Sequence, residues 1–444
     1  MGMGRRQEHY QADLWVPTTD LPRSPGHPFY DKLNALLAEA GFDPHVEDLC
    51  RPYYTEGVGR DSIPPGVYFR MLLVGYFEAL DSQRAIAWRC SDGLSLRAFL
   101  GIPLHEPTPD HSSLTKIRQR LPLEVHQQVF VFVLKVAQDK KLLRGKTLAV
   151  DSTTLEANAA MRGIVRKDSG EDWKDYLKRL MAEQGIEDPS DEDIRRFDKG
   201  RKKKKVSNKE WESPADPDSR IAKMKDGTTH LAYKAEHVVD LDSEFVLAAE
   251  VYTADQADPA TLVDSVVQAQ VNVVLAGGEQ EIEEAVADKG YHKAQTLADC
   301  QTCNTRTYIP EPKGRKYNWD DKPQEWRRAT EANRRRTRGA RSKRLQKLRS
   351  ERVERSFAHV CETGGGRRTW LRGLVNVAKR YAVQVAGHNL GLLMRKLFGV
   401  GKPRTLQGGS GRSVGAFGWW YWLCGRRAGY SHGRKWLLSP YTAA

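Results

Sequence analysis

Apolar residues recur at helical spacing along the first 140 residues of the chain. Pro65 occupies a favoured first-turn position, and an apolar helix should begin there. Asp110 is expected to cap a helix that carries Lys116, Arg118 and Arg120 on an exposed face. Further helices are predicted at residues 29–40, 81–88, up to residue 100 from Asp92 or Ser95, and 124–143. Residues 1–144 are therefore predicted to be an all-α N-terminal domain.

From Lys146 the pattern changes to short apolar or alternating runs, which are typical of strands. A buried strand is predicted at residues 148–150, after Gly145, and a hairpin at residues 231–241 and 245–252. A helix at residues 254–269 and strands at 285–287 and 307–309 complete the order. Because parallel strands need crossover connections, residues 145–400 are predicted to form an α/β domain, a mixed sheet with flanking helices.

Two segments differ from this pattern in composition. Residues 162–229 are polar, with one predicted helix at 173–181, and are expected to form a flexible insertion without a core of its own. Their lysine run, residues 202–205, could contact DNA backbone, although most such runs are solvated. Residues 401–444 are rich in Gly and Arg around Trp419 to Trp422, and are predicted to be a poorly ordered tail.

The charge of the chain narrows the class of partner. A net charge of +14 predicts a polyanion, because neutralised phosphates release counterions. From residue 327 to 349, eleven Arg or Lys face a single acid, Glu331, and we expect this segment, with Arg334, Arg335 and Arg336, to contact the nucleic-acid backbone.

Other features argue against a membrane or a secreted protein. The chain has no apolar run near 18 residues and no signal-peptide core at its start, so no membrane partner is expected. Six cysteines do not make a disulfide framework in a chain of this length. We therefore predict a reducing, cytoplasmic compartment, with association to the nucleoid.

The all-helical region has two interpretations. Basic residues on the helix that follows Asp110 suit a helix-turn-helix DNA-binding element. The alternative is a helical scaffold with ordinary solvated cations, and the pattern does not separate the two.

Three acids stand where a two-metal phosphoryl-transfer site needs them. Asp151 and Asp288 each follow a predicted strand, and Glu354 lies on a predicted helix. A lone strand-end aspartate is more often a cap, but a carboxylate buried there must be hydrogen-bonded, paired or bound to a metal. Two Mg²⁺ or Mn²⁺ ions roughly 4 Å apart neutralise charge on phosphodiester oxygens, and these ions prefer carboxylate ligands. The three acids are therefore the predicted catalytic and metal-binding residues.

Zinc is the competing hypothesis for a metal site. Cys300 and Cys303 have zinc-ligand spacing, and His292, His359 or Cys361 might complete a set. A single such pair without a second is a weak signal.

Several stretches together resemble the DDE transposases of bacterial insertion sequences. A-V-D-S-T-T around Asp151, A-D-K-G-Y around Asp288 and E-R-V-E-R-S-F around Glu354 are similar to the three signature regions of that family. T-P-D-H-S-S-L-T-K-I-R, from residue 108, looks like part of its helical N-terminal domain. The resemblance spans about residues 10–400. It implies a ribonuclease-H-like catalytic fold, Mg²⁺ or Mn²⁺ as cofactor, and double-stranded DNA as partner.

The resemblance also assigns residues. Asp151, Asp288 and Glu354 match the family's three acids, and Lys289 and Tyr291 follow the second acid as in the family. Many relatives carry basic and aromatic residues at fixed intervals around the third acid. This chain has Lys347, Ser350 and Cys361 at those positions, so the basic roles pass to Arg352, Arg355, Arg367 or Arg368. Lys289, Tyr291, Arg352 and Arg355 are accordingly predicted to contact DNA. The departure leaves Glu351 as an alternative third acid, since it lies on the same helix face.

The predicted function is metal-dependent cleavage and strand transfer of insertion-sequence ends, by a homodimer or a higher assembly on DNA. Two alternatives remain open: a transposase-derived DNA-binding protein without catalysis, and a stand-alone nuclease of the same fold.

Overall fold

A computed structural model describes residues 15–17, 19–21, 26–55, 62–201, 207–224, 227–314 and 317–406. The lysine run at 202–205 and the part of the tail from residue 407 onward lie outside the described residues. Residues 1–403 form one compact unit, and a second begins at Arg404. Among the described residues, no helix has the length and apolar character that crossing a membrane requires.

The N-terminal region is helical, as predicted. Pro65 opens α3, and the Asp110 carboxylate caps α6 by accepting from the Ser113 N–H at 2.8 Å. The expected start at Asp81 is slightly wrong, because Ser82 supplies the cap of α4. The helices are α1 (Pro28–Glu39), α2 (Phe42–Cys50), α3 (Pro65–Phe77), α4 (Gln83–Asp92), α5 (Leu94–Leu100), α6 (His111–Arg120) and α7 (Leu123–Asp139), with a 3₁₀ turn at Arg51–Tyr53.

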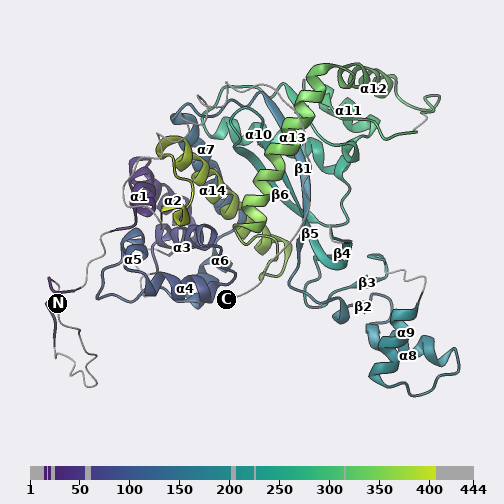
Figure 1. Cartoon of the computed structure of the whole chain (residues 1–444), viewed down its shortest axis with the longest axis horizontal. Coiled ribbons are helices and arrows are strands. Elements are labelled where there is room, and N and C mark those ends of the chain that lie inside the picture. Colours follow the sequence, from purple (N-terminus) through teal and green to yellow (C-terminus); the bar gives the residue numbers. More distant parts are fainter. Residues whose placement is uncertain are drawn as a thin grey trace, which may run out of the picture. The chain divides into compact units, whose positions relative to one another are not determined.

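The sheet that follows is mixed, with β1 at its centre (Figure 1). β5 runs antiparallel to β1 and β6, whereas β7 and β8 run parallel to β1. A short strand, β4, pairs with the first residues of β5 on the edge that β6 also uses. The strands are β1 (Thr147–Glu156), β4 (Arg220–Lys223), β5 (Thr229–Asp240), β6 (Val246–Thr253), β7 (Glu284–Val286) and β8 (Arg306–Tyr308).

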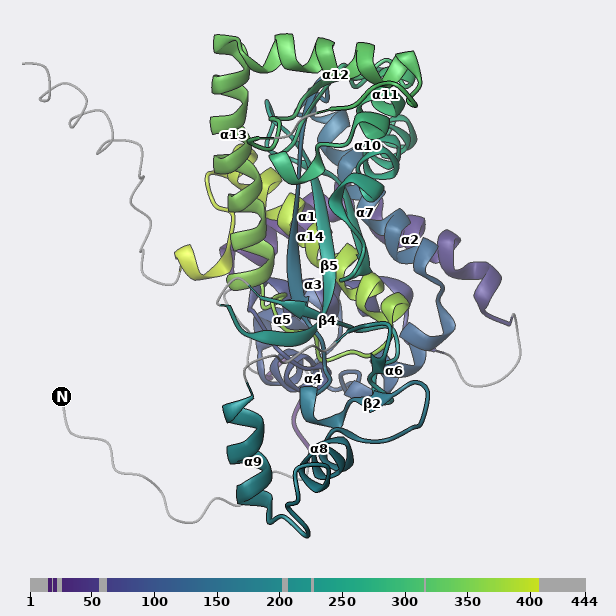
Figure 2. The ribbon, with the colours of Figure 1, turned by 90° about the vertical axis from the view of Figure 1, so that its right-hand side faces the viewer.

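Helices cover both faces of this sheet. Side chains alternate along β1, so Ser152 contacts α10 on one face while Asp151 contacts α13 on the other. Figure 2 shows α10 and α13 on opposite sides of the strands. α14 also packs on β6 and on α7. The helices are α10 (Asp258–Leu275), α11 (Ala294–Thr302), α12 (Gln324–Thr337), α13 (Ala340–Phe357) and α14 (Leu374–Phe398), with short turns at Met161–Gly163, Lys289–Tyr291, Ala358–Glu362 and Pro403–Leu406.

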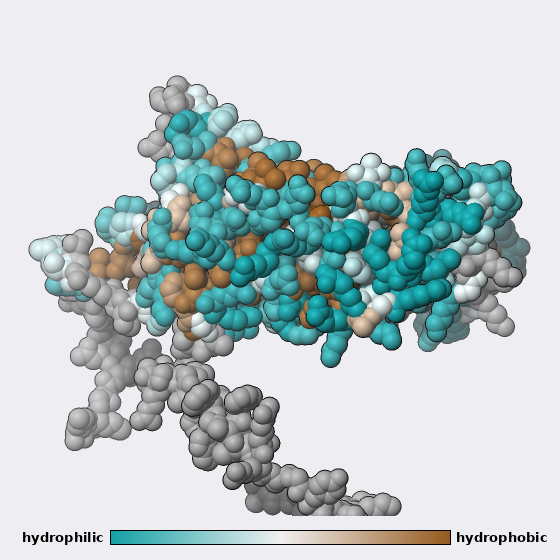
Figure 3. All heavy atoms as spheres, turned by 90° about the horizontal axis from the view of Figure 1, so that it is seen from above, coloured by the Kyte–Doolittle hydropathy of each residue, from teal (hydrophilic) through white to brown (hydrophobic). Residues whose placement is uncertain are grey.

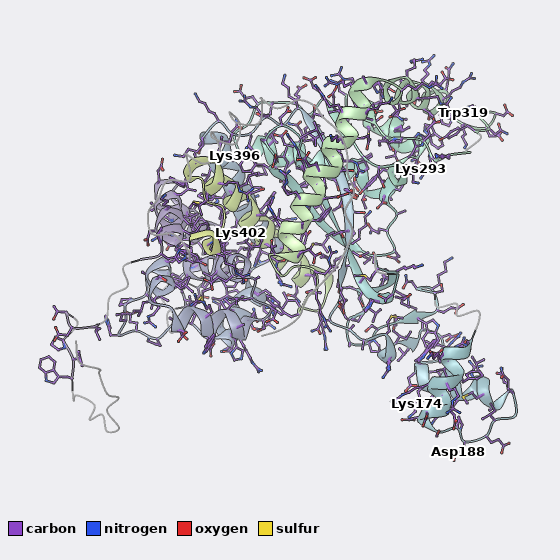
Figure 4. All side chains as sticks on the ribbon, viewed as in Figure 1. Lys174, Asp188, Lys293, Trp319, Lys396 and Lys402 are labelled. Carbon is purple, nitrogen blue, oxygen red and sulfur yellow. The ribbon has the colours of Figure 1, made fainter. Side chains whose placement is uncertain are left out.

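The expectation of an insertion without a core is wrong for its described part. Helices α8 (Trp173–Ala182) and α9 (Asp191–Gly200) pack Leu177, Met181 and Ile194 into a small apolar cluster. Trp173 and Trp211 stack edge to face beside it, next to a two-stranded ribbon, β2 (Val165–Arg166) and β3 (Trp211–Glu212). Figure 4 labels Lys174 and Asp188 on this α8–α9 segment. A few aromatic residues compensate for the polar composition.

Candidate active site on β1 and after β7

Asp151 lies within β1, and Asp288 follows the end of β7, the parallel neighbour of β1. The prediction that the strand ends at residue 150 is wrong, because pairing with β5 continues β1 to Glu156. The ladder between β1 and β7 pairs Thr147 with Glu284 and ends with the pair Ala149 and Val286. Asp151 and Asp288 each lie two residues beyond that last pair, so the same register places them at corresponding positions. Carboxyl ends of parallel strands are common positions for ligand-binding residues in α/β proteins.

Asp151 is held from two sides. Its Oδ1 accepts from the Ser152 N–H at 2.8 Å, and its Oδ2 accepts from Arg349 Nη1 at 2.6 Å. The Arg349 side chain, which reaches over from α13, is only 13% exposed, and that of Asp151 is 25% exposed. The Arg349 guanidinium, on the helix that crosses the sheet, thus balances the charge of the Asp151 carboxylate.

Asp288 begins the short turn after β7. Its Oδ1 accepts from the Gly290 N–H at 2.7 Å. A Cβ added at Gly290 would lie 2.9 Å from this same Oδ1 and 3.1 Å from Oδ2 of Asp258, the first residue of α10. Glycine therefore leaves a small hollow between two carboxylates that any side chain would fill.

α13 crosses the sheet, and successive side chains contact successive strands (Figure 1). Arg341 pairs with Glu284 of β7 at 2.6 Å, and Ser356 hydrogen-bonds His237 of β5 at 2.8 Å. Glu354 lies off this buried face and is exposed. Its carboxylate makes no hydrogen bond or ion pair with any described residue, whereas Glu351 pairs with Arg355 at 2.5 Å.

The structure therefore brings Asp151 and Asp288 to corresponding positions beyond the β1–β7 ladder, without Glu354. Within the described ranges, no group of three or more His, Cys, Asp or Glu side chains is arranged to hold a metal ion. The described residues therefore contain no such group around Cys300 and Cys303 either. Cys300 is buried, and burial raises its pKa to about 12, whereas Cys303 is exposed.

A buried polar network lies behind β1 on the α10 face. Lys234 Nζ contacts Asp258 Oδ1 at 2.9 Å and Glu236 Oε2 at 3.4 Å. Glu236 also accepts from the hydroxyls of Thr261, Ser265 and Tyr291. Burial, followed by the negative charge of Glu236, raises the pKa of Tyr291, which keeps this phenol protonated.

The predicted DNA-contacting residues fall into two groups. Lys116, Arg120, Lys289 and Arg335 are exposed. The remaining residues make internal contacts: Arg334 with Glu311, Arg336 with Thr307, Arg352 and Arg355 with Glu244, and Tyr291 with Glu236.

Two of these expectations need correction. Arg118 is not on an exposed face: its Nε and Nη1 are buried, and burial lowers the pKa of its guanidinium. Tyr291 is 1% exposed, because it lies in the turn after β7 and its hydroxyl donates to the buried Glu236.

Sequence reasoning missed Arg349, Asp258, Lys234 and Glu236. In the sequence, Arg349 is the last cation of a basic segment and lies five residues, about 1.4 helical turns, before Glu354. Lys234 and Glu236 did carry a signal, because they lie within a predicted strand and charged residues buried in a sheet must be paired.

Comparison with known families gives two matches. Residues 19–120 match a family described as Transposase domain (DUF772), and residues 279–394 match one described as Transposase DDE domain. The second match includes Asp288 and Glu354, while Asp151 lies between the two matched ranges. No curated protein matches the chain.

Proposed function

We propose that this chain, which its two matched domains identify as a DDE-type transposase, cuts the DNA ends of an insertion sequence and joins them to target DNA. The observation that carries the proposal is the placement of Asp151 and Asp288 at corresponding positions, each two residues beyond the last pair of the parallel β1–β7 ladder.

A ribonuclease-H-like catalytic fold is part of this proposal. The strand order β6-β5-β1-β7-β8 supports it, with three antiparallel strands followed by two that run parallel to the first. So does the position of the acids, on the central strand, at the end of its parallel neighbour and on a helix that crosses the sheet. Residues 1–144 are proposed as the DNA-binding domain and 145–400 as the catalytic domain.

The donor set fits a hard divalent cation. Asp151 and Asp288 would hold Mg²⁺ or Mn²⁺, since such ions prefer carboxylate oxygens, and the hollow at Gly290 leaves space beside Asp288. When bound, the ion supplies positive charge to phosphate oxygens and acidifies water. In the structure, Arg349 pairs with the Asp151 carboxylate and orients it.

Glu354 is proposed as the third acid. Its carboxylate has no partner among the described residues, whereas Arg355 occupies that of Glu351, so Glu354 is the acid on α13 that a cation could recruit. Because the three acids are not grouped, a DNA-binding protein without catalysis is the second candidate.

DNA contact is proposed for the corner where α12 meets α13. Six exposed cations there make no side-chain hydrogen bond or ion pair with any described residue: Arg328, Arg335, Arg338, Lys343, Arg344 and Lys347. Figure 4 shows side chains projecting outward from α12, near Trp319, and the surface over this part in Figure 3 is predominantly hydrophilic. Such unpaired cations suit phosphate backbone, and the partner is proposed to be double-stranded DNA bound by a dimer or higher assembly.

Two glutamine variants on one helix test the assignment. Glu354→Gln removes charge from an exposed, unpaired carboxylate, so it should lower cleavage by about 100-fold or more while DNA affinity and melting temperature stay unchanged. Glu351→Gln is the matched control and should cut nearly as fast as wild type. Loss of cleavage only in Glu351→Gln would show that Glu351, and not Glu354, is the third acid. Normal cleavage by both variants would show that neither glutamate of α13 is a catalytic acid.

A further inference from the structure

Asp258 lies beside both Ser152 of β1 and the turn that follows β7 without belonging to either strand. It is the first residue of α10, on the sheet face opposite Arg349. Its Oδ1 accepts from the Ser152 hydroxyl at 3.0 Å, and Ser152 directly follows Asp151 in β1. The same oxygen contacts Lys234 Nζ at 2.9 Å. Asp258 is thereby fixed to β1 and β5 at once.

The buried partner of Asp258 is Lys234, and this lysine does not cancel the charge of Asp258. The Lys234 side chain is 6% exposed, and its ammonium also donates to the Thr261 hydroxyl at 2.9 Å. This one cation lies between two carboxylates, Asp258 and Glu236, so the three groups together retain a net negative charge. Of the two acids, Glu236 is fully buried and bound by hydroxyls, whereas the side chain of Asp258 is 34% exposed.

The other oxygen of Asp258 lies near Gly290, as does the Asp288 carboxylate. Asp258 Oδ2 makes no hydrogen bond or ion pair with the residues that the structure describes. It lies 3.1 Å from the point where a Cβ on Gly290 would stand, and Asp288 Oδ1 lies 2.9 Å from that point. Asp258 Oδ2 and Asp288 Oδ1 are therefore within about 6 Å of each other, and both lie beside Gly290. Two like charges this close are unfavourable unless a cation is shared between them.

We infer that Asp258 is a positioning residue of the active site that raises its affinity for a divalent cation. It adds negative charge beside Asp288, and through Ser152 it holds the part of β1 that carries Asp151. This inference rests on the proposed function, since it assumes that Asp288 binds the ion. Removing a residue that orients metal ligands without binding the metal itself changes metal affinity by about 10–100-fold.

The test is Mn²⁺ binding by the full-length protein without DNA, measured by titration calorimetry. Asp258→Asn keeps the shape of the side chain and should raise the dissociation constant for Mn²⁺ about 10-fold. Asp264→Asn is the matched control, an exposed aspartate on the same helix, and should bind as wild type. Asp288→Asn should bind far more weakly than either variant.

A second variant covers the case in which Asp258→Asn does not fold. Gly290→Ala leaves every bond of Asp258 in place and fills the hollow between the carboxylates, so it too should weaken Mn²⁺ binding. Wild-type affinity in Asp258→Asn or in Gly290→Ala, with binding lost in Asp288→Asn, would overturn the inference alone. If Asp288→Asn bound Mn²⁺ as wild type does, the metal site of the proposed function would fail as well.

Discussion

The side chain of each residue along β1 and β5 points to one face of the sheet. His237 is paired with Asp151 across the strands, yet its ring stacks on Phe357 at 4.1 Å and hydrogen-bonds Ser356 and Tyr381. Burial lowers the pKa of this histidine to about 3, so it is neutral at physiological pH. His237 therefore connects α13 and α14 to β5, and it is not positioned as a proton carrier.

Glu250 provides a prediction for pH at the residue scale. Burial, followed by repulsion from Glu236 opposite it on β5, raises the pKa of Glu250 to about 7. The folded state then binds a proton more tightly than the unfolded chain, so stability falls as pH rises from about 4.5 to about 7. Glu250→Gln should remove this dependence.

The measurement is the melting temperature of both proteins between pH 5 and pH 8. The melting temperature of Glu250→Gln should exceed that of wild type only slightly at pH 5 and by more at pH 8. The reason is that only wild type must ionise the half-buried Glu250 carboxyl as pH rises. A constant difference across that range would show that Glu250 does not titrate in the folded protein.

At the scale of elements, α14 approaches its neighbours through glycines. A Cβ on Gly387 would lie 2.5 Å from the Tyr76 ring of α3, and one on Gly391 would lie 2.8 Å from the Gly401 carbonyl oxygen. Two small residues one turn apart thus allow α3 and the segment after α14 to contact the helix backbone closely.

Gly387→Ala should therefore destabilise the fold. The added methyl group overlaps a buried aromatic ring and should lower the free energy of unfolding by about 1–3 kcal/mol. Gly200→Ala, at the end of α9, meets no atom within 4 Å and is the control. Thermal unfolding monitored by circular dichroism would report the effect, and equal melting temperatures for the two variants would show that Tyr76 simply moves aside.

Elements with local signals could be predicted from the sequence, and long-range arrangements could not. Pro65 and Asp110 mark helix starts through their own backbone and side-chain chemistry, and the hairpin β5–β6 follows from alternation and a tight turn. The core of the insertion was missed because aromatic residues such as Trp173 and Trp211, distant in sequence, meet only after folding.

The same distinction holds for the site. Asp151 and Asp288 could be recognised because each follows an apolar run, but their register depends on the pairing of β1 with β7, which no local pattern encodes. Arg349 and Asp258 belong to helices distant in sequence from β1. Only the packing of α13 and α10 on opposite faces reveals their contacts.

At the scale of the whole molecule, the net charge of +14 is concentrated in part at the α12–α13 corner. If its six unpaired cations each neutralise a phosphate, the logarithm of the DNA association constant should fall with the logarithm of salt concentration with a slope of about −5. Replacing Arg335, Arg338 and Lys343 by glutamine should reduce that slope by about 3.

The control for this prediction lies on the insertion. Lys174, Arg179 and Arg196 are exposed and paired with acids, so their replacement by glutamine should leave the slope unchanged. Fluorescence anisotropy with a labelled duplex at several salt concentrations gives the slope. If the corner variant kept the wild-type slope, the α12–α13 corner would not be the DNA-binding surface.

Cleavage of the element's own DNA ends is the most direct test of the central claim, that Asp151 and Asp288 support metal-dependent DNA cutting. A plasmid with the coding region and its flanking DNA is incubated with wild type, Asp151→Asn or Asp288→Asn, in Mg²⁺ or in EDTA, and nicked and joined products are counted. Wild type should cut and join only with Mg²⁺, and both variants should bind the DNA but leave it intact. Cutting by both variants at the wild-type rate, or by wild type in EDTA, would contradict the account.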